Sequence, residues 1–273
     1  MTKNLDKEGL RSVFDKYELF FIDLWGVVHN GIELHKNAIH TLSKITEAKK
    51  NYILLTNAPR PNKIVKIFLE NLGLDKSMSE NVFTSGEAAL QTLKKNSYGK
   101  KFYHIGPKRD NDLIEGLEKN KTSLDKCEFI LCTGLFEDKE NSIDYYKNLL
   151  RKYIKKKMIC TNPDLIVHRG SQREYCAGTL ASAFEKLGGE VIYFGNPHPE
   201  IYKFCTKNNE SILVVGDNLR TDILGANNMN FDSLFITNGI HRDEFLNLPV
   251  ENYDKILEKY KTKTNYYQAK LTW

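Results

Sequence analysis

Long apolar runs are missing from this sequence. None approaches the roughly 18 consecutive apolar residues that a membrane-spanning helix requires. Residues 1–16 alternate charged and apolar side chains and lack the apolar stretch of a secretory signal. The five cysteines are odd in number and form no Cys-x-x-Cys pair, which is atypical of a disulfide framework. We therefore expect a cytoplasmic protein with reduced, mostly buried thiols and no membrane partner.

A strong charge of one sign is also missing. The 40 Lys and Arg residues and the 35 Asp and Glu residues give a formal charge of +5, spread along the chain. This mild excess is far short of a basic arm, so we expect no nucleic-acid partner. Seven prolines and 17 glycines exclude a collagen-like or low-complexity chain. The 41% of hydrophobic residues within 273 residues allows two average domains, or one large domain with an insertion.

One pattern recurs along the chain, in which a short apolar run ends abruptly in a polar residue. It occurs at 19–23, 52–57, 191–196, 212–217 and 234–239. Such runs, rich in Val, Ile and Phe, are typical of strands buried on both faces. Amphipathic segments at 38–50, 63–72 and 179–187 predict helices between them. Strands that alternate with helices predict an α/β fold with a parallel sheet.

The region between these halves predicts a second, smaller α/β unit. Strand candidates lie at 102–105, 129–132 and 158–160, and an amphipathic helix is expected at 141–154. We therefore expect a discontinuous core of residues 1–84 and 180–273, with residues 85–179 inserted into it. The last dozen residues, 262–273, are polar with aromatics and form either a docked or a frayed tail.

Polar side chains stand at the ends of the predicted strands of the core. They are Asp23, Thr56, Asn196, Asp217 and Asn238. Ligands of parallel α/β sheets bind outside the carboxyl ends of the strands, so these side chains converge on one crevice if the strands are neighbours. The alternative is that they only begin turns, which favour Asp, Asn and Thr.

Carboxylates are concentrated in this group. Asp217 and Asp222 lie five residues apart at a strand-to-helix junction, and Asp23 makes a third. Three clustered carboxylates cannot all stay ionised without compensation, and Mg²⁺ is the typical cation where phosphate also binds. Thr56 adds a hydroxyl, Asn57 an amide, and helix N-termini add N–H groups for an anion. The set points to phosphoryl transfer through an aspartyl-phosphate.

These residues carry a family likeness. They are Phe21-Ile22-Asp23-Leu24-Trp25-Gly26-Val27, Leu54-Leu55-Thr56-Asn57, Gly195-Asn196-Pro197-His198-Pro199 and the stretch 216–222, with Thr84-Ser85-Gly86-Glu87 and Thr161-Asn162-Pro163-Asp164. In these motifs the chain resembles the haloacid dehalogenase-like (HAD) hydrolase superfamily, class IIA, which includes nitrophenylphosphatase-like, phosphoglycolate and pyridoxal phosphatases. The resemblance implies a Rossmann-like core and, over 85–179, an inserted C2-type cap. Members of this class often pair through the cap, so it also admits a homodimer.

The resemblance also implies roles for individual residues. Asp23 is the nucleophile, and Thr56, Asn57 and Asn196 bind the phosphoryl group. Mg²⁺ is held by Asp23, Asp217, Asp222 and the backbone carbonyl of Trp25. Thr56 and Asn196 also count among the catalytic positions.

Trp25 departs from the family pattern, because phosphatases of this family carry an acidic general acid at that position. Indole donates no useful proton at neutral pH, and general acids typically contribute about 10²–10⁴-fold. The protein should therefore favour acyl or aryl phosphates, whose leaving groups need no proton. His29 is a candidate replacement for the acid, although a loop histidine without chemistry is the interpretation we favour.

Asn196 is the second departure, since it stands where the family has Lys. Losing one electrostatic stabiliser costs roughly 10²–10³ in rate. Lys203, Arg60 and Arg220 are other possible sources of positive charge. Asp164 and Arg169 lie in the expected cap and are candidates to face the substrate.

Three functions follow from these observations. The first is a Mg²⁺-dependent hydrolase of small phosphorylated metabolites that acts through Asp23. The second is a catalytically impaired homologue that binds a phosphorylated ligand or a protein partner. The third, metal-independent carbon–halogen hydrolysis, is disfavoured because unmetallated Asp217 and Asp222 beside Asp23 would repel one another.

Overall fold

The computed structural model describes residues 2–140, 142–169, 172–207 and 210–273. In this part of the chain, one sheet has seven strands in the order β1-β13-β12-β11-β2-β3-β4, and all neighbours are parallel. The strands are β1 (Lys3–Asn4), β2 (Leu19–Ile22), β3 (Asn51–Thr56), β4 (Val82–Thr84), β11 (Ile212–Gly216), β12 (Asp232–Ile236) and β13 (Tyr266–Gln268). We call this sheet and the helices packed on it the first unit.

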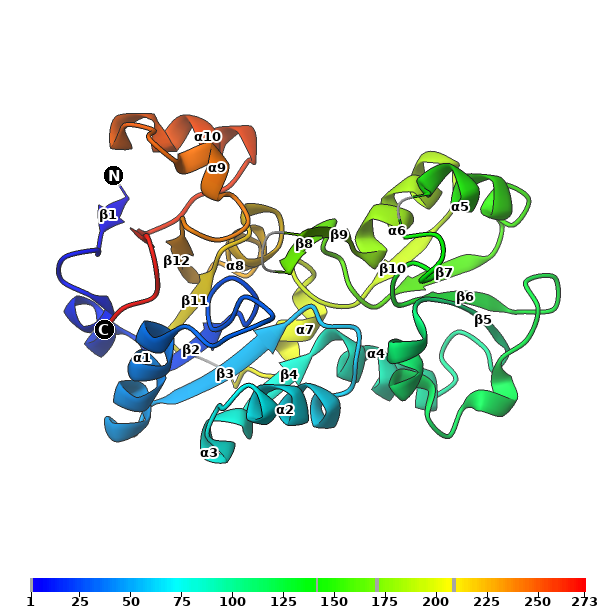
Figure 1. Cartoon of the computed structure of the whole chain (residues 1–273), viewed down its shortest axis with the longest axis horizontal. Helices are drawn as coiled ribbons and strands as arrows, with labels where there is room; N and C mark the ends of the chain where they lie inside the picture. The colour runs from blue at the N-terminus through cyan, green and yellow to red at the C-terminus, as the bar shows by residue number, and fades with distance from the viewer. Residues whose placement is uncertain (1, 141, 170–171, 208–209) are drawn as a thin grey trace.

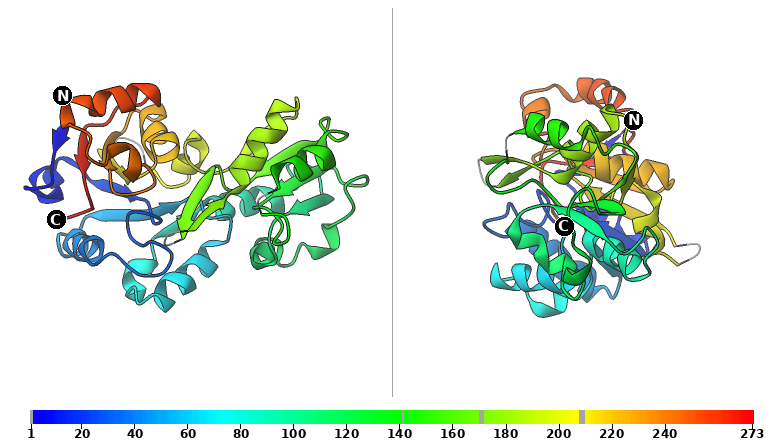
Figure 2. Two further views of the ribbon diagram at one scale, coloured as in Figure 1. Left: turned by 45° about the horizontal axis from the view of Figure 1, so that its top comes forward. Right: turned by 90° about the vertical axis from the view of Figure 1, so that its right-hand side faces the viewer.

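A second parallel sheet has the order β10-β7-β6-β5. Its strands are β5 (Phe102–Ile105), β6 (Phe129–Cys132), β7 (Lys157–Cys160) and β10 (Val191–Tyr193). We call it, with its helices, the second unit. An antiparallel hairpin of β8 (Ile166–Arg169) and β9 (Gln172–Tyr175) lies between the two units, as Figures 1 and 2 show. The α/β class and the parallel sheet predicted from the sequence are confirmed.

Helices flank both sheets (Figure 1). They are α1 (Lys36–Glu47), α2 (Asn62–Asn71), α3 (Lys76–Ser79), α4 (Ser85–Lys94), α5 (Ile143–Leu150), α6 (Ala177–Lys186), α7 (Pro199–Lys203), α8 (Leu224–Asn228), α9 (Arg242–Phe245) and α10 (Tyr253–Lys259). A five-residue π turn, Leu219–Ile223, leads into α8. The helix expected at 141–154 appears as the shorter α5, and residue 141 lies outside the described residues. None of the helices in the described ranges combines the length and the apolar character needed to cross a membrane.

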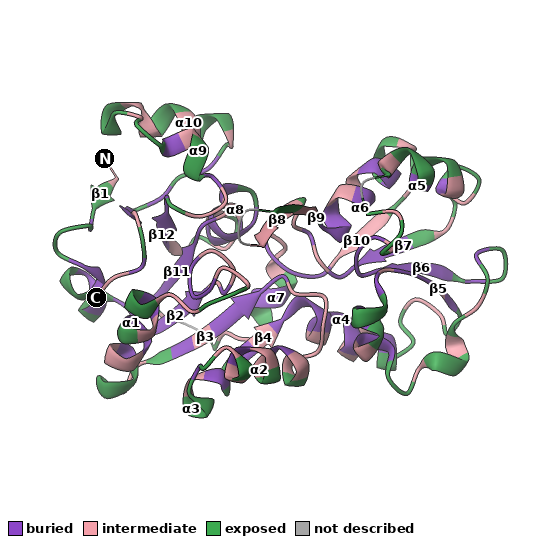
Figure 3. Ribbon diagram, in the orientation of Figure 1, coloured by how far each residue is buried: buried purple, intermediate pink, exposed green. Residues whose placement is uncertain are grey.

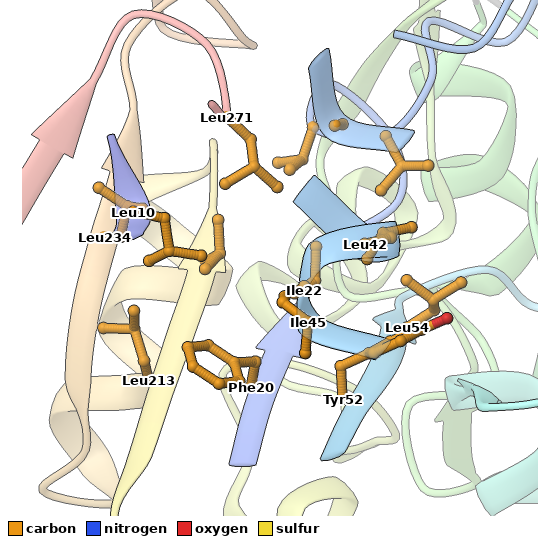
Figure 4. Packing of buried hydrophobic residues seen from close by; sticks show 14 of the residues in the cluster. Leu10, Phe20, Ile22, Leu42, Ile45, Tyr52, Leu54, Leu213, Leu234 and Leu271 are labelled. Atoms are coloured by element: carbon orange, nitrogen blue, oxygen red, sulfur yellow. The ribbon is translucent and has the colours of Figure 1, made fainter. Parts of the chain in front are cut away.

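The central strands are buried on both faces, as their unbroken apolar sequences predict. Phe20 and Ile22 of β2 pack with α1 on one face of the sheet, in the cluster that Figure 4 shows. Leu19 and Phe21 of the same strand pack on the opposite face, around Tyr202 of α7. Figure 3 shows the same contrast between buried strands and the exposed outer sides of the helices. The ends of β2 and β11 are therefore held side by side.

The sequence pattern predicts that the segment 191–196 forms a strand of the core sheet. The segment does not join the first sheet, so this expectation is wrong. β10 pairs in parallel with β7 of the second sheet, with Ile192 opposite Ile159. Leu180 and Phe184 of α6 also pack in the core of the second unit, so this unit continues past the expected boundary at 179. A short apolar run has the same pattern in either sheet. The strand with which it pairs depends on tertiary packing, which the local sequence does not reveal.

The C-terminal tail is docked in the first sheet. β13 pairs with β12 and β1, neither of which the sequence pattern singled out as its neighbour. The buried Gln268 amide donates to the carbonyl of Leu5 at 3.1 Å and to the hydroxyl of Thr272 at 2.8 Å. This one side chain therefore ties the tail to the N-terminal segment. All five cysteines are free, four of them buried and Cys205 partly exposed.

Replacing Gln268 with Ala should destabilise the fold by about 1–3 kcal/mol, because the buried carbonyl of Leu5 loses its donor. Urea unfolding followed by circular dichroism measures the change. Lys270→Ala, on an exposed residue of the same tail, serves as the control and should change the free energy of unfolding by less than about 0.5 kcal/mol. Equal effects of the two substitutions would contradict a docked tail.

Candidate active site

Three carboxylates meet at the carboxyl end of the first sheet. Asp23 follows β2, Asp217 follows β11, and Asp222 lies in the π turn after β11. One carboxylate oxygen from each lies within 4.8 Å of the other two. The parallel register of the two strands brings this about, since the N–H of Asp23 donates to the carbonyl of Val215 at 2.9 Å. The structure thus brings Asp23 together with Asp217 and Asp222, which lie about 190 residues later in the sequence.

Glycines make room for these carboxylates. A Cβ atom on Gly26, or one on Gly239, would lie 2.0 Å from Oδ2 of Asp217, far inside van der Waals contact. Gly26 also has φ +88°, a left-handed conformation that strains other residues. The loop after β2 can therefore approach Asp217 only with glycine at position 26.

Neutral donors orient the two inner carboxylates. The N–H of Ile240 donates to Oδ2 of Asp217 at 2.6 Å, and the N–H of Asn218 donates to Oδ2 of Asp222 at 3.1 Å. Within the described ranges, no lysine, arginine or histidine forms an ion pair with any of the three acids. The cluster therefore carries negative charge that the described side chains leave uncompensated.

Burial and mutual repulsion act on the protonation of this cluster. Burial, followed by the charges of the neighbouring carboxylates, raises the pKa of Asp23 and of Asp217 well above the ordinary value. Burial and the charge of Asp164 raise the pKa of Asp222 to about 7. An all-oxygen donor set with excess negative charge fits a hard divalent cation such as Mg²⁺. The carbonyl oxygen of Trp25, which receives no hydrogen bond from a described residue, is free to act as a further ligand.

Exposure distinguishes Asp23 from the other two acids. Asp217 and Asp222 are 5% and 3% exposed, whereas Asp23 is only partly buried. All three line a cavity of about 370 Å³. Asp23 is thus the member of the cluster that a substrate in this cavity reaches most easily, as a nucleophile requires.

Thr56 is the last residue of β3, which lies next to β2 in the sheet, and Asn57 follows it. The hydroxyl oxygen of Thr56 accepts from the N–H of Ala58 at 3.2 Å, so its own proton can be donated to a ligand. The side-chain N–H groups of Asn57 donate to the carbonyl of Asn196 at 3.1 Å and to Oδ1 of Asp164 at 3.2 Å. Both side-chain N–H groups of Asn57 are therefore engaged within the protein, where they position Asn196 and Asp164.

Asn196 enters the site from the linker after β10. Its N–H donates to Oδ1 of Asn57 at 2.7 Å, and its side-chain amide donates to Oδ1 of Asp222 at 3.0 Å. Its own Oδ1 is buried and has no partner among the described residues. Asn196 therefore contacts the acidic cluster as expected, but it brings a dipole in place of a charge.

Trp25 joins the two units. Its indole N–H donates to the carbonyl of His168 in β8 at 2.7 Å, and the guanidinium of Arg169 lies 5.1 Å from its ring centroid. Arg169 in turn pairs with Glu174 at 2.8 Å. The side chain at position 25 is therefore used to hold the hairpin and takes no part in proton donation.

The other candidate groups have partners elsewhere. His29 is buried, accepts from the N–H of Gly31 at 2.9 Å, and has its pKa lowered to about 4, chiefly by burial, so it is a neutral loop histidine. Lys203 is exposed. Arg60 pairs with Asp112, and the guanidinium of Arg220 lies 4.6 Å from the ring centroid of Tyr260. None of these three cations replaces the family's Lys by pairing with the acidic cluster.

A second cavity of about 600 Å³ adjoins the first and reaches between the two units. The two cavities share five lining residues, which are Trp25, Thr56, Asn57, Asp164 and Val167. Oδ1 of Asp164 accepts from the side-chain amides of Asn57 and Asn218, both at 3.2 Å. The sequence indicates Asp164 as a candidate to face the substrate, and the structure places it in the lining of both cavities.

Comparisons with known proteins identify the family of the chain. Residues 20–119 match the family model described as haloacid dehalogenase-like hydrolase, and residues 193–262 match one described as HAD-hydrolase-like. The chain is 26% identical to phosphoglycolate phosphatase 2 from Arabidopsis thaliana, over 95% of each chain. It is 26% identical to the ribonucleotide monophosphatase NagD from Escherichia coli (strain K12), over 77% of this chain and 86% of that protein.

A solved structure described as a hydrolase of the haloacid dehalogenase-like family, from Brucella suis 1330, matches with a TM-score of 0.84. It is 29% identical and covers 97% of this chain and 99% of its own. The two family models together span more than half of the chain and include Asp23, Thr56, Asn196, Asp217 and Asp222. The chain therefore belongs to the haloacid dehalogenase-like hydrolases, and its relatives indicate class IIA of that superfamily.

Proposed function

We propose that this protein is a Mg²⁺-dependent phosphatase that hydrolyses a small phosphorylated metabolite through an aspartyl-phosphate at Asp23. The observation that carries the proposal is the arrangement of three carboxylates that line one cavity, of which Asp23 is the most exposed. The names of its relatives, a phosphoglycolate phosphatase and a ribonucleotide monophosphatase, support the reaction class.

The metal would be held by Asp23, Asp217 and the backbone carbonyl of Trp25, with Asp222 in support. The donor set supports this assignment, because buried carboxylate oxygens without a basic partner suit a hard cation. When bound, Mg²⁺ would offset the negative charge of the acids and of the phosphoryl group.

The protein's own groups account for the remaining steps. A carboxylate oxygen of Asp23 attacks phosphorus, and the bond from phosphorus to the leaving oxygen breaks. The Thr56 hydroxyl, whose oxygen already accepts from Ala58, donates to a phosphoryl oxygen. The amide of Asn196 lies against Asp222 and is expected to stabilise the phosphoryl group more weakly than a charged Lys.

The leaving group would occupy the larger cavity, of about 600 Å³, which the second unit helps to line. This volume suits a small metabolite. The free cysteines support the proposed cytoplasmic location, since thiols stay reduced there. A homodimer formed through the second unit remains a prediction.

A second candidate function is a homologue that binds a phosphorylated ligand but has lost turnover. Two observations favour it: the Trp25 side chain is engaged with the hairpin, and no cation pairs with the acidic cluster in the described ranges. This candidate keeps the ion site and the phosphate contacts.

Purified protein should hydrolyse p-nitrophenyl phosphate only when Mg²⁺ is present, and Asp23→Asn should abolish turnover, because an amide cannot form the aspartyl-phosphate. Release of p-nitrophenol, followed by absorbance, measures the rate. Asp15→Asn is a matched control, since the Asp15 side chain is 99% exposed and far outside the cluster. Turnover that survives in Asp23→Asn, or that persists in EDTA, would contradict the mechanism.

Mg²⁺ should raise the melting temperature more at about pH 8 than at about pH 5. The folded pKa of Asp222, about 7, exceeds its unfolded value. Without metal, its contribution to stability is present below the unfolded pKa and is lost as the pH rises through about 7. Mg²⁺ takes the place of the lost protons. Differential scanning calorimetry measures the increment, which should vanish in Asp217→Asn. The same increment in that variant would place the ion elsewhere.

Restoring the family's residues distinguishes the two candidates. Under the second candidate, the wild-type protein is stabilised by Mg²⁺ with phosphate yet turns over no phosphate monoester, and Asn196→Lys with Trp25→Asp creates turnover. Under the first, the wild-type protein is active, and Asn196→Lys alone raises kcat by about 10-fold or more. Turnover assays of wild type and both variants on one panel of phosphate monoesters decide between them.

A further inference from the structure

The phosphatase proposed above needs a proton donor that position 25 does not provide. An alkyl leaving group departs as a strongly basic alkoxide unless it is protonated, whereas an aryl or acyl group departs without help. The indole N–H of Trp25 is bound to the carbonyl of His168, and neutral His29 is held within its own loop. The donor must therefore be sought among the other groups that face both the phosphoryl group and the leaving group.

A group that faces both the phosphoryl group and the leaving group must lie where the two cavities meet, a region that we call the neck. The smaller cavity holds Asp23, and the larger one offers room for the leaving group. Of the five residues that line both, four are Trp25, Thr56, Asn57 and Val167, which do not ionise near neutral pH. The fifth is Asp164, and its carboxyl is the one acid at the neck among the described residues.

The carboxyl of Asp164 is held in a fixed orientation. The side-chain amides of Asn57 and Asn218 both donate to Oδ1, each at 3.2 Å. These two asparagines follow β3 and β11, so groups of the first unit donate hydrogen bonds to an acid that the second unit supplies. Neither amide engages Oδ2. A catalytic acid needs fixed positioning of this kind.

The surroundings of Asp164 suit proton exchange near neutral pH. Burial raises its pKa to about 6, although hydrogen bonds from Asn57, Thr221 and Asn218 oppose the rise. The ionisable groups that face it are the cluster acids Asp23, Asp217 and Asp222 from the first unit, and the thiols of Cys160 and Cys176 from the second. No basic side chain is among them in the described ranges, so nothing there holds the carboxyl permanently ionised.

We propose that Asp164 is the general acid of the first step and the general base of the second, in place of the acid missing at position 25. In the first step Asp23 bonds to phosphorus, the bond to the leaving oxygen breaks, and the Asp164 proton passes to that oxygen, which leaves as an alcohol. In the second step the Asp164 carboxylate takes a proton from water, whose oxygen bonds to phosphorus. The bond from phosphorus to Asp23 then breaks, and phosphate and both starting carboxyl states are restored.

This assignment changes the substrate preference expected from Trp25 alone. The wild-type protein should process alkyl phosphates as well as aryl phosphates. The marked preference for aryl or acyl leaving groups belongs instead to a variant that lacks the acid at position 164.

Asp164→Asn tests the assignment, because Asn keeps an oxygen that accepts from the two amides but cannot give a proton. Rapid-quench experiments should compare p-nitrophenyl phosphate with an alkyl phosphate that the wild-type protein hydrolyses. In the variant, the first-turnover rate with the alkyl phosphate should fall by about 10²–10⁴-fold. The first-turnover release of p-nitrophenol should change by less than about 10-fold, and phosphoenzyme should accumulate because the second step lacks its base.

Asp232→Asn provides the matched control. Asp232 is a partly buried acid of β12 whose Oδ1 accepts from the side-chain amide of Asn265 at 2.7 Å, and it lines neither of the two cavities. Its substitution should leave the ratio of the aryl to the alkyl rate unchanged. The pH profile gives a second readout: the fall of the alkyl rate at high pH should be present in the wild type and absent in Asp164→Asn.

The outcomes separate this inference from the proposed function. A wild-type protein that hydrolyses neither substrate contradicts the phosphatase and, with it, the role of Asp164. If the wild-type protein hydrolyses alkyl phosphates, the phosphatase stands and the variant tests Asp164 alone. The role of Asp164 is contradicted if Asp164→Asn slows both substrates equally. It is also contradicted if Asp164→Asn leaves the alkyl rate and its pH profile unchanged.

Discussion

The repulsion among three carboxylates is the constraint around which this protein is organised. Bringing Asp23, Asp217 and Asp222 within 4.8 Å of one another is costly in free energy, and no described cation offsets the cost. The chain accommodates the carboxylates with backbone N–H groups that donate to Asp217 and Asp222, and with glycines that leave space for them. An architecture that accepts such a cost without basic partners is suited to a bound cation and an anionic substrate, and this is the chemistry of the family to which the chain belongs.

The two departures from the family pattern have different structural consequences. Trp25 exchanges a proton-donating side chain for a contact between units, through the carbonyl of His168 and the guanidinium of Arg169. Asn196 exchanges a charge for a hydrogen bond to Asp222. Both substitutions leave the backbone and the three acids in place. Under the proposed function, the groups that would bind the ion are thus retained, whereas the two changes bear on proton donation and on charge stabilisation.

The sequence predicts most of the first sheet, because strands buried on both faces have unbroken apolar runs and end in polar residues. It also places the three acids in one crevice, since parallel strands share a carboxyl edge. It fails for β10, whose apolar run carries no information about which sheet it joins. The hairpin β8–β9 escapes prediction because its strands are short, β8 is only partly buried and β9 is mostly exposed. The contact from Trp25 to His168 spans 143 residues and depends on how the units pack, which no local pattern encodes.

The contacts of the Asn57 amide also bear on what happens when the two units separate. It connects the linker at Asn196 with Asp164, which the second unit supplies, and so helps to hold Asp164 at the cavity that the acids of the first unit line. Any swing that parts the units also withdraws Asp164 from Asp23. A phosphorylated intermediate exposed by such a swing would meet bulk water without a base to activate it. Under the proposed roles of Asp23 and Asp164, hydrolysis of the phosphorylated intermediate would be confined to the state in which the two units are in contact.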